Sequence, residues 1–250
     1  MNNPSEILVD ATGPVARLTL NRPYALNALT PQLLTKLGNE LENLANEVAI
    51  RLIVITGAGR AFSAGVDLKA LGDRSLDGGS VGVILDEPAR RVIDLITSMP
   101  KLVLAKVNGF CFTGALELTL ACDLVVVADE ARFGDTHAKF GLRPTWGMSQ
   151  RLIRAVGPAK ARELSYTSRT FTGREAVEWG IAVQSVPLEQ LDQVVDRLIE
   201  QVLANSDGSL AAYKDLFSAA LDKGLGIGLE YEARTNYMIT DTNDRLADFR

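Results

Sequence analysis

The sequence contains few of the residues that bind transition metals or form disulfides. Among its 250 residues are one histidine and two cysteines, Cys111 and Cys122. A structural zinc site usually needs four ligands, and small secreted domains are held together by several disulfides. Both cysteines lie in apolar stretches and are predicted to be free thiols in a reducing compartment. We therefore expect no metal site and no disulfide framework.

Long apolar runs and targeting signals are also missing. The opening residues, MNNPSEILVD, lack the basic segment and apolar run of a signal peptide. The most apolar stretch, residues 115–128, is interrupted by Glu117 and Asp123, so it is unsuited to span a membrane. These features predict a cytoplasmic protein without a membrane partner.

The charge balance is mildly acidic. Lys plus Arg number 26 against 31 Asp plus Glu, a net charge of −5, and the pI is about 5.1. Such a surface gives no reason to expect nucleic acid as a partner. Apolar residues make up 47% and charged residues 23%, as in an average globular protein with a sizeable core.

The apolar patterning predicts an α/β protein. Strands are expected at residues 16–20, 52–56, 101–107 and 124–128. A helix is expected to begin at Thr30-Pro31, and its buried face is predicted to comprise Leu33, Leu34, Leu37, Leu41, Leu44 and Val48. A second helix is predicted to bury Val83, Ala89, Val92, Ile93 and Ile96. The expected strand–strand–helix pattern continues to about residue 186, and a helical tail follows. Because such a tail often packs on another subunit, we expect an oligomer.

Several familiar catalytic motifs are absent. The loop after residues 52–56 has Phe62 where a dinucleotide-binding fingerprint needs glycine. The sequence has no Gly-Lys-Ser/Thr phosphate loop, no Gly-x-Ser-x-Gly elbow and no His-Glu-x-x-His motif. Kinases, nucleotide-dependent dehydrogenases, α/β-hydrolases and zinc proteases are therefore disfavoured.

Two junctions between a strand and a helix contain small residues, around Gly65-Val66 and around Gly114. At a helix start the backbone N–H groups lack intrahelical partners and point outward. Two such starts side by side would present two donors to one oxygen, which is the design of an oxyanion hole. Spacing alone favours the simpler interpretation, in which the glycines only allow close strand–helix packing.

Two titratable residues near these junctions are candidates for acid–base chemistry. Glu117 lies three residues beyond Gly114 among apolar neighbours, where burial would raise its pKa toward neutrality. It could equally just complement a helix dipole. His137, the only histidine, could be a bystander, and Asp135 could orient the imidazole or simply cap a turn.

At this point the sequence resembles the crotonase superfamily, the enoyl-CoA hydratase/isomerase family. Three ordered blocks carry the resemblance across nearly the whole chain: residues 21–29 (NRPYALNAL), 54–68 (VITGAGRAFSAGVDL) and 107–123 (VNGFCFTGALELTLACD). The resemblance implies a ββα spiral core over residues 1–195 and a helical trimerisation region over residues 196–250. It also implies a homotrimer or a homohexamer.

The resemblance further implies roles for individual residues. The N–H groups of Val66 and Gly114 would hold the thioester carbonyl oxygen of an acyl-CoA, and Glu117 would be the first catalytic carboxylate. The coenzyme A groove would be formed by Ala25, Ala28, Ala64, Asp67, Leu68 and Lys69. Coenzyme A enters as part of the substrate, and no separate cofactor is implied.

The sequence departs from the family at the second acid–base position. In hydratases with two glutamates, the second follows Phe-Gly by three residues, and here that place is occupied by His137. The usual proline before it is Thr136, and Ala115 follows Gly114 in place of another glycine. Imidazole can donate or accept a proton near neutral pH, so the replacement is chemically feasible.

The resemblance and the residues together predict an acyl-CoA lyase that adds water to a 2-enoyl-CoA. Glu117 would deprotonate water, and His137 would share that water or protonate the α-carbon. Three alternatives stay open: double-bond isomerisation, hydrolysis with Asp135 or His137 as nucleophile or base, and acyl-CoA binding without catalysis. A serine protease of the same fold lacks any identifiable nucleophile motif.

Overall fold

The computed structural model describes residues 5–72 and 76–247. Its strands are β1 (Ile7–Thr12), β2 (Val15–Leu20), β3 (Leu52–Gly57), β4 (Ala61–Ser63), β5 (Leu102–Val107), β6 (Phe110–Phe112), β7 (Leu124–Ala128), β8 (Arg132–Gly134), β9 (Phe171–Thr172) and β10 (Gln184–Val186). Its α-helices are α1 (Pro31–Asn46), α2 (Val83–Ser98), α3 (Gly114–Ala121), α4 (Met148–Thr167), α5 (Gly173–Glu178), α6 (Leu191–Leu203), α7 (Asp207–Asp222), α8 (Leu225–Arg234) and α9 (Thr242–Ala247).

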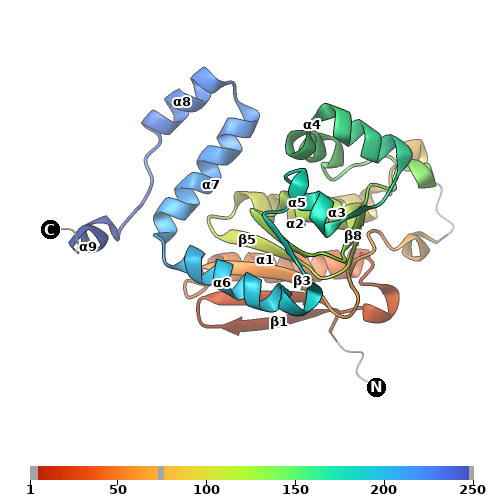
Figure 1. Ribbon diagram of the computed structural model, residues 1–250, viewed down its shortest axis with the longest axis horizontal. Helices are drawn as coiled ribbons and strands as arrows, with labels where there is room; N and C mark the ends of the chain where they lie inside the picture. The colour runs from red at the N-terminus through yellow and green to blue at the C-terminus, as the bar shows by residue number, and fades with distance from the viewer. Residues whose placement is uncertain (1–4, 73–75, 248–250) are drawn as a thin grey trace.

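The strands form two sheets. The larger has the order β1-β2-β3-β5-β7-β10, in which only the β1–β2 pair is antiparallel. The smaller has the order β4-β6-β8-β9, in which β8 and β9 are antiparallel. Strands β3, β5 and β7 each continue into the smaller sheet as β4, β6 and β8, and the helices α2, α3 and α4 follow (Figure 1). This repetition is the expected ββα spiral.

The buried face of α1 follows the predicted spacing. Thr30 caps the helix by accepting a hydrogen bond from the N–H of Leu33 at 3.1 Å, and Pro31 occupies the first turn. Two predicted core positions are wrong. Val48 is 93% exposed because α1 ends at Asn46, and Val83 is 65% exposed because it lies in the first turn of α2, before that helix reaches the core.

The helical tail does not separate from the spiral at the predicted boundary. Residues 195 and 196 both lie inside α6, and Val194, Val195 and Ile199 of that helix are part of the hydrophobic core. Helices α8 and α9 have no buried residues and lie away from the sheets (Figure 1). The part of the tail that projects from the core is therefore α8 and α9.

Helix α7 is attached to the spiral by a buried lysine. The Nζ of Lys214 donates hydrogen bonds to the carbonyl oxygens of Ile96 and Lys101, at 2.6 and 2.9 Å, and to Oδ2 of Asp123, at 2.8 Å. Only 6% of the lysine side chain is exposed. Burial raises the pKa of Asp123, although Lys214 and backbone N–H groups act in the opposite direction.

Candidate active site

Glu117 is a buried carboxylate held by the chain that precedes α4. It lies in the first turn of α3 and is 1% exposed. Its Oε1 accepts hydrogen bonds from the N–H groups of Trp146, at 3.0 Å, and Met148, at 2.9 Å. Burial raises the pKa of Glu117, and these two bonds together with His137 only partly oppose the shift. The second oxygen, Oε2, accepts no hydrogen bond from the described residues, so it is the one free for chemistry.

His137 faces that second oxygen. Its Nε2 lies 3.7 Å from Oε2 of Glu117, and the histidine is 8% exposed. Its other ring nitrogen, Nδ1, lies 2.7 Å from Oδ1 of Asp135. The sole histidine is therefore next to the predicted first carboxylate.

Asp135 both orients the imidazole and closes the turn. Its Oδ1 also accepts a hydrogen bond from the backbone N–H of His137, at 3.3 Å, and its Oδ2 accepts one from Oγ of Ser165 on α4, at 2.7 Å. Burial alone would raise the pKa of Asp135, but the hydrogen bonds outweigh it and leave the pKa below the ordinary value. An ionised carboxylate can only accept, so Nδ1 carries the hydrogen and Nε2 is directed to Glu117.

The two predicted N–H donors lie on turns that contact each other. Strands β4 and β6 are parallel neighbours with Ser63 opposite Cys111, and Val66 and Gly114 each follow three residues later. A Cβ added to Gly65 would lie 2.4 Å from Oγ1 of Thr113. With φ of +85°, Gly65 also has a backbone conformation that other residues rarely adopt. The structure therefore places the two turns to which the resemblance assigned the donors in contact with each other.

Neither of the two predicted donor amides is taken up by a hydrogen bond among the described residues. The segment around Leu29 pairs with the turn at Val66: the N–H of Leu29 donates to the carbonyl of Gly65, and the N–H of Asp67 donates to the carbonyl of Leu29. Because successive backbone N–H groups of an extended segment point to opposite sides, the N–H of Val66 points away from Leu29. Gly114 is the first residue of α3 and has no intrahelical acceptor. Within residues 5–72 and 76–247, neither N–H donates a hydrogen bond to a protein group.

Thr113, immediately before Gly114, is strained. Its φ of 47° and ψ of −115° are unusual for a β-branched residue, and its N–H donates to the carbonyl of Gly134 at 2.9 Å. Such conformations persist only where the surrounding structure imposes them, and they cluster at functional sites. The strained residue thus lies between β6 and the donor at Gly114.

The segments predicted to form the coenzyme A groove run side by side. The N–H of Ala64 donates to the carbonyl of Leu26 at 2.9 Å, which places residues 25–28 beside residues 64–68. Ala25, Ala28 and Ala64 are half-buried, whereas Leu68 and Lys69 are exposed. The two segments therefore offer an accessible edge next to the turn at Val66.

Asp67 has a structural partner that the sequence did not indicate. Its Oδ2 accepts hydrogen bonds from both terminal nitrogens of Arg22 at 3.1 Å, and its Oδ1 accepts from the N–H of Lys69 at 3.2 Å. Arg22 also donates to the carbonyl of Ala28 at 2.6 Å. The ion pair fixes the turn that carries Val66. Position 22 lies in the NRP triplet, but nothing in its spacing pointed to Asp67.

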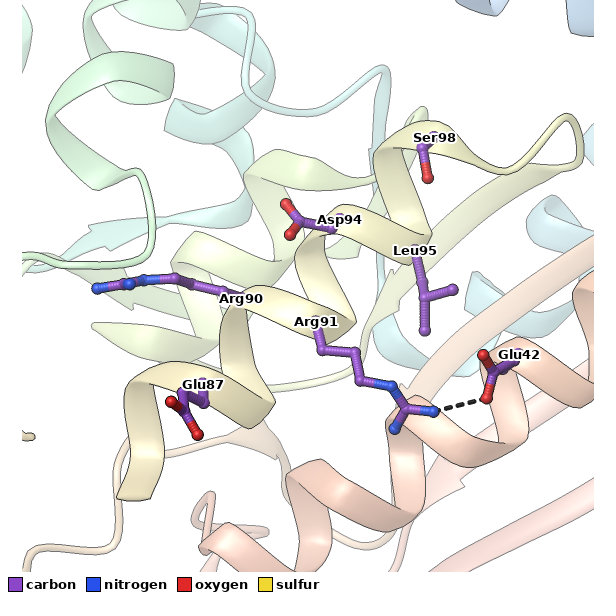
Figure 2. A pocket seen from close by; sticks show the side chains of 7 residues that line it. All are labelled: Glu42, Glu87, Arg90, Arg91, Asp94, Leu95 and Ser98. Carbon is purple, nitrogen blue, oxygen red and sulfur yellow. Dashed lines mark hydrogen bonds and ion pairs between the residues drawn. The ribbon is translucent and has the colours of Figure 1, made fainter. Parts of the chain in front are cut away.

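A charged hollow on the surface is not the site. It lies between α1 and α2 and has a volume of about 430 Å³ (Figure 2). It is lined mainly by charged residues of both signs: Glu42, Glu87, Arg90, Arg91, Asp94, Leu95 and Ser98. Arg91 is already paired with Glu42 at 2.7 Å, and none of the predicted site residues lines the hollow.

Comparison with known proteins gives consistent matches over nearly the whole chain. The family model described as enoyl-CoA hydratase/isomerase matches residues 10–247. The chain is 33% identical to a probable peroxisomal enoyl-CoA hydratase of Arabidopsis thaliana, over 88% of this chain and 81% of that one. It is 32% identical to the 2,3-dehydroadipyl-CoA hydratase of Escherichia coli, over 96% and 92%. Among solved structures, an enoyl-CoA hydratase of Bacillus anthracis superposes with a TM-score of 0.90 at 31% identity, covering 98% of this chain and 96% of that one.

Proposed function

The chain belongs to the enoyl-CoA hydratase/isomerase family, the crotonase superfamily, and on that premise we propose that it adds water to a 2-enoyl-CoA. It is an enoyl-CoA hydratase-like lyase. The observation that carries the proposal for its site is the placement of Glu117 and His137. Their facing atoms, Oε2 and Nε2, lie 3.7 Å apart, on a spiral whose two donor turns are in contact.

The N–H groups of Val66 and Gly114 would hold the thioester carbonyl oxygen. Addition of water to the β-carbon places negative charge on that oxygen as the enolate forms. Donors fixed in advance stabilise this charge without reorganising, and removal of one such donor typically lowers kcat by about 10²–10³-fold. Both amides lack protein acceptors among the described residues, which supports this role.

Glu117 and His137 would divide the two proton transfers. Glu117 takes a proton from water through Oε2 while the water oxygen bonds to the β-carbon. The imidazolium of His137 gives its Nε2 proton to the α-carbon, and ionised Asp135 stabilises that cation beforehand. A proton then passes from Glu117 to His137 across the 3.7 Å between them, and the site returns to its starting state. Coenzyme A enters as part of the substrate, and the chemistry proposed here needs no further cofactor.

The proposal is tested with a panel of acyl- and enoyl-CoAs whose products are identified by mass spectrometry. We expect 2-enoyl-CoAs of some chain length to gain one water without release of free coenzyme A. Migration of the double bond in a 3-enoyl-CoA would favour an isomerase, and release of the free thiol would favour a hydrolase. Binding of the whole panel without turnover would contradict catalysis.

Replacing Asp135 with asparagine is expected to lower kcat by about 10²-fold, the lower end of what a positioned acid–base group contributes. The amide of Asp135→Asn carries no charge and can present an N–H to Nδ1, so it no longer stabilises the imidazolium of His137 that gives up the Nε2 proton. Steady-state kinetics would measure the loss. Ser165→Ala, which leaves the Asp135–His137 contact intact, should lose less activity. If Asp135→Asn retains the wild-type kcat, the proton role of His137 is wrong.

We further propose that the chain assembles as a homotrimer or homohexamer through its terminal helices. Large apolar side chains are exposed along α7 and α8: Tyr213, Phe217, Leu221, Leu225, Ile227 and Leu229. Clusters of exposed large apolar side chains often mark association sites. The exposed position of α8 away from the sheets supports this proposal (Figure 1).

Light scattering should give a particle of three or six times the 27.0 kDa chain mass. The double variant Leu225→Glu/Ile227→Glu should lower that mass, because charges would be buried in the contact. Val48→Glu should leave the particle mass unchanged, because Val48 lies outside these helices and is already 93% exposed. A wild-type monomer would contradict the proposal.

The cellular location is proposed to be the cytoplasm. Within residues 5–72 and 76–247, no helix combines the length and apolarity needed to cross a bilayer. Microscopy of a fluorescent fusion in the native host would test the location, and a signal confined to an organelle or envelope would contradict it.

A further inference from the structure

Trp146 touches both halves of the proposed site. Its backbone N–H donates to Oε1 of Glu117 at 3.0 Å. Its indole ring packs on Gly114, so closely that a Cβ added there would lie 2.3 Å from Cζ3 of the ring. One residue therefore contacts the carboxylate proposed to activate water and the glycine proposed to hold the carbonyl.

The indole ring is held in place by a buried carboxylate on α2. Its Nε1–H donates to Oδ1 of Asp86 at 2.8 Å. Asp86 is 5% exposed, and its Oδ1 also accepts a hydrogen bond from Oγ1 of Thr145 at 2.6 Å. Its Oδ2 accepts one from Oγ of Ser80 at 3.0 Å, and the guanidinium of Arg90 lies 4.0 Å away. A buried carboxylate is costly unless it is paired, and here the donors include the tryptophan of the site.

We propose that Asp86 is a positioning residue, which acts through the indole of Trp146 to set the spacing between Glu117 and the amide of Gly114. The inference rests on the proposed function, since it names the residues that align its two parts. Asp86 itself contacts neither Glu117 nor Gly114 among the interactions described, so its effect on catalysis passes through the ring.

The expected effect follows from the precision that catalysis requires. Productive geometry must be held within about 0.5 Å, and a displacement of about 1 Å can cost about 10²-fold in rate. Without Asp86 the indole N–H would be left buried and unpaired, so the ring would shift toward another acceptor or water. The same shift would move the N–H that holds Glu117.

The test compares kcat and KM among four variants. Asp86→Ala should lower kcat by about 10- to 100-fold and change KM by less than about threefold, because alignment is lost and binding is not. Asp86→Asn should recover most of kcat, since its oxygen can accept from the indole while the Ser80 hydroxyl accepts from its amide. Trp146→Phe should lower kcat by about tenfold. In the Trp146→Phe background, Asp86→Ala should lower kcat by less than about a further threefold, because the hydrogen bond between the indole and Asp86 is already absent.

Ser80→Ala is the matched control, since it removes the donor to the other oxygen of Asp86 and leaves the indole bond. Its kcat should remain within about twofold of wild type. A second readout is fluorescence: in a Trp179→Phe background, Trp146 is the only tryptophan. Asp86→Ala should then shift its emission to the red, and Asp86→Asn should not.

Three results would overturn the inference. One is an unchanged kcat in folded Asp86→Ala, and another is full additivity of Asp86→Ala with Trp146→Phe. The third is a loss confined to KM. If the wild-type protein hydrates no enoyl-CoA, the proposed function fails by itself. The kcat ratios are then measured on the acyl-CoA reaction that the panel identifies, and the emission shift still decides whether Asp86 fixes the ring.

Discussion

Glu117→Gln is expected to lower kcat by about 10²–10⁴-fold, the contribution of a positioned acid–base group. The loss has a chemical cause. Glutamine keeps an oxygen that can accept the N–H groups of Trp146 and Met148, but it cannot take a proton from water. Steady-state assay with the 2-enoyl-CoA identified by the panel would measure it. As a control, Glu163→Gln on the surface of α4 should leave kcat within about twofold.

The same substitution should stabilise the fold at neutral pH. Because burial raises the pKa of Glu117 in the folded state, its ionisation opposes folding. Below the ordinary glutamate pKa of about 4.3 the carboxyl is neutral in both states and brings no penalty. As pH rises through the folded-state pKa, the wild-type protein loses stability that Glu117→Gln retains. Thermal melts at several pH values would show a Tm difference between Glu117→Gln and the wild type that grows as the pH rises. A variant that is less stable than wild type at pH 7 would contradict this assignment, and wild-type turnover would end the proposed mechanism.

Lys214→Met should lower the free energy of unfolding by about 3 kcal/mol, because it leaves the carboxylate of Asp123, which is only 18% exposed, without its cation. For a chain of this size that corresponds to a fall in Tm of roughly 6–12 °C. The variant also removes the hydrogen bonds to Ile96 and Lys101, which attach α7 to the spiral. Chemical denaturation monitored by circular dichroism would measure the change.

A matched lysine separates this effect from simple loss of charge. Lys36 pairs with Glu6 at 3.3 Å but is 52% exposed, so Lys36→Met should cost less than about 1 kcal/mol. In a double-mutant cycle, Lys214→Met with Asp123→Asn should cost less than the sum of the single changes, since neither charge is then left alone. Additive losses, or a cost for Lys214→Met as small as that for Lys36→Met, would show that the pair is not the source of the stability.

Local sequence patterns predicted the central elements well. The strand expected at residues 124–128 is β7, and the start of α1 at Thr30-Pro31 was correct because capping is a local interaction. The strands of the smaller sheet have two or three residues each, too few for a period, so their pairing was not predictable.

The candidate site shows the same division between local and distant interactions. The resemblance located Glu117, His137 and the two donor turns, but it did not show that the imidazole faces the carboxylate. Trp146 is 29 residues from Glu117 in sequence, and Asp86 is 60 residues from Trp146. No spacing rule links residues so far apart, because only the packing of α2 and α3 with the chain before α4 brings them together.

The paired amides at Val66 and Gly114 belong to the main chain, and this has a consequence for how the protein can change. A substitution at position 66 alters the side chain and keeps the N–H, unless the new residue is proline. The proposed donor at position 66 is therefore kept through most substitutions, whereas at position 114 any side chain would meet the indole of Trp146. The proposed proton transfers depend instead on the identities of residues 117 and 137. Under the proposed function, new reactions on the same thioester carbonyl are accessible by exchanging the side chains at positions 117 and 137, while the two main-chain donors stay the same.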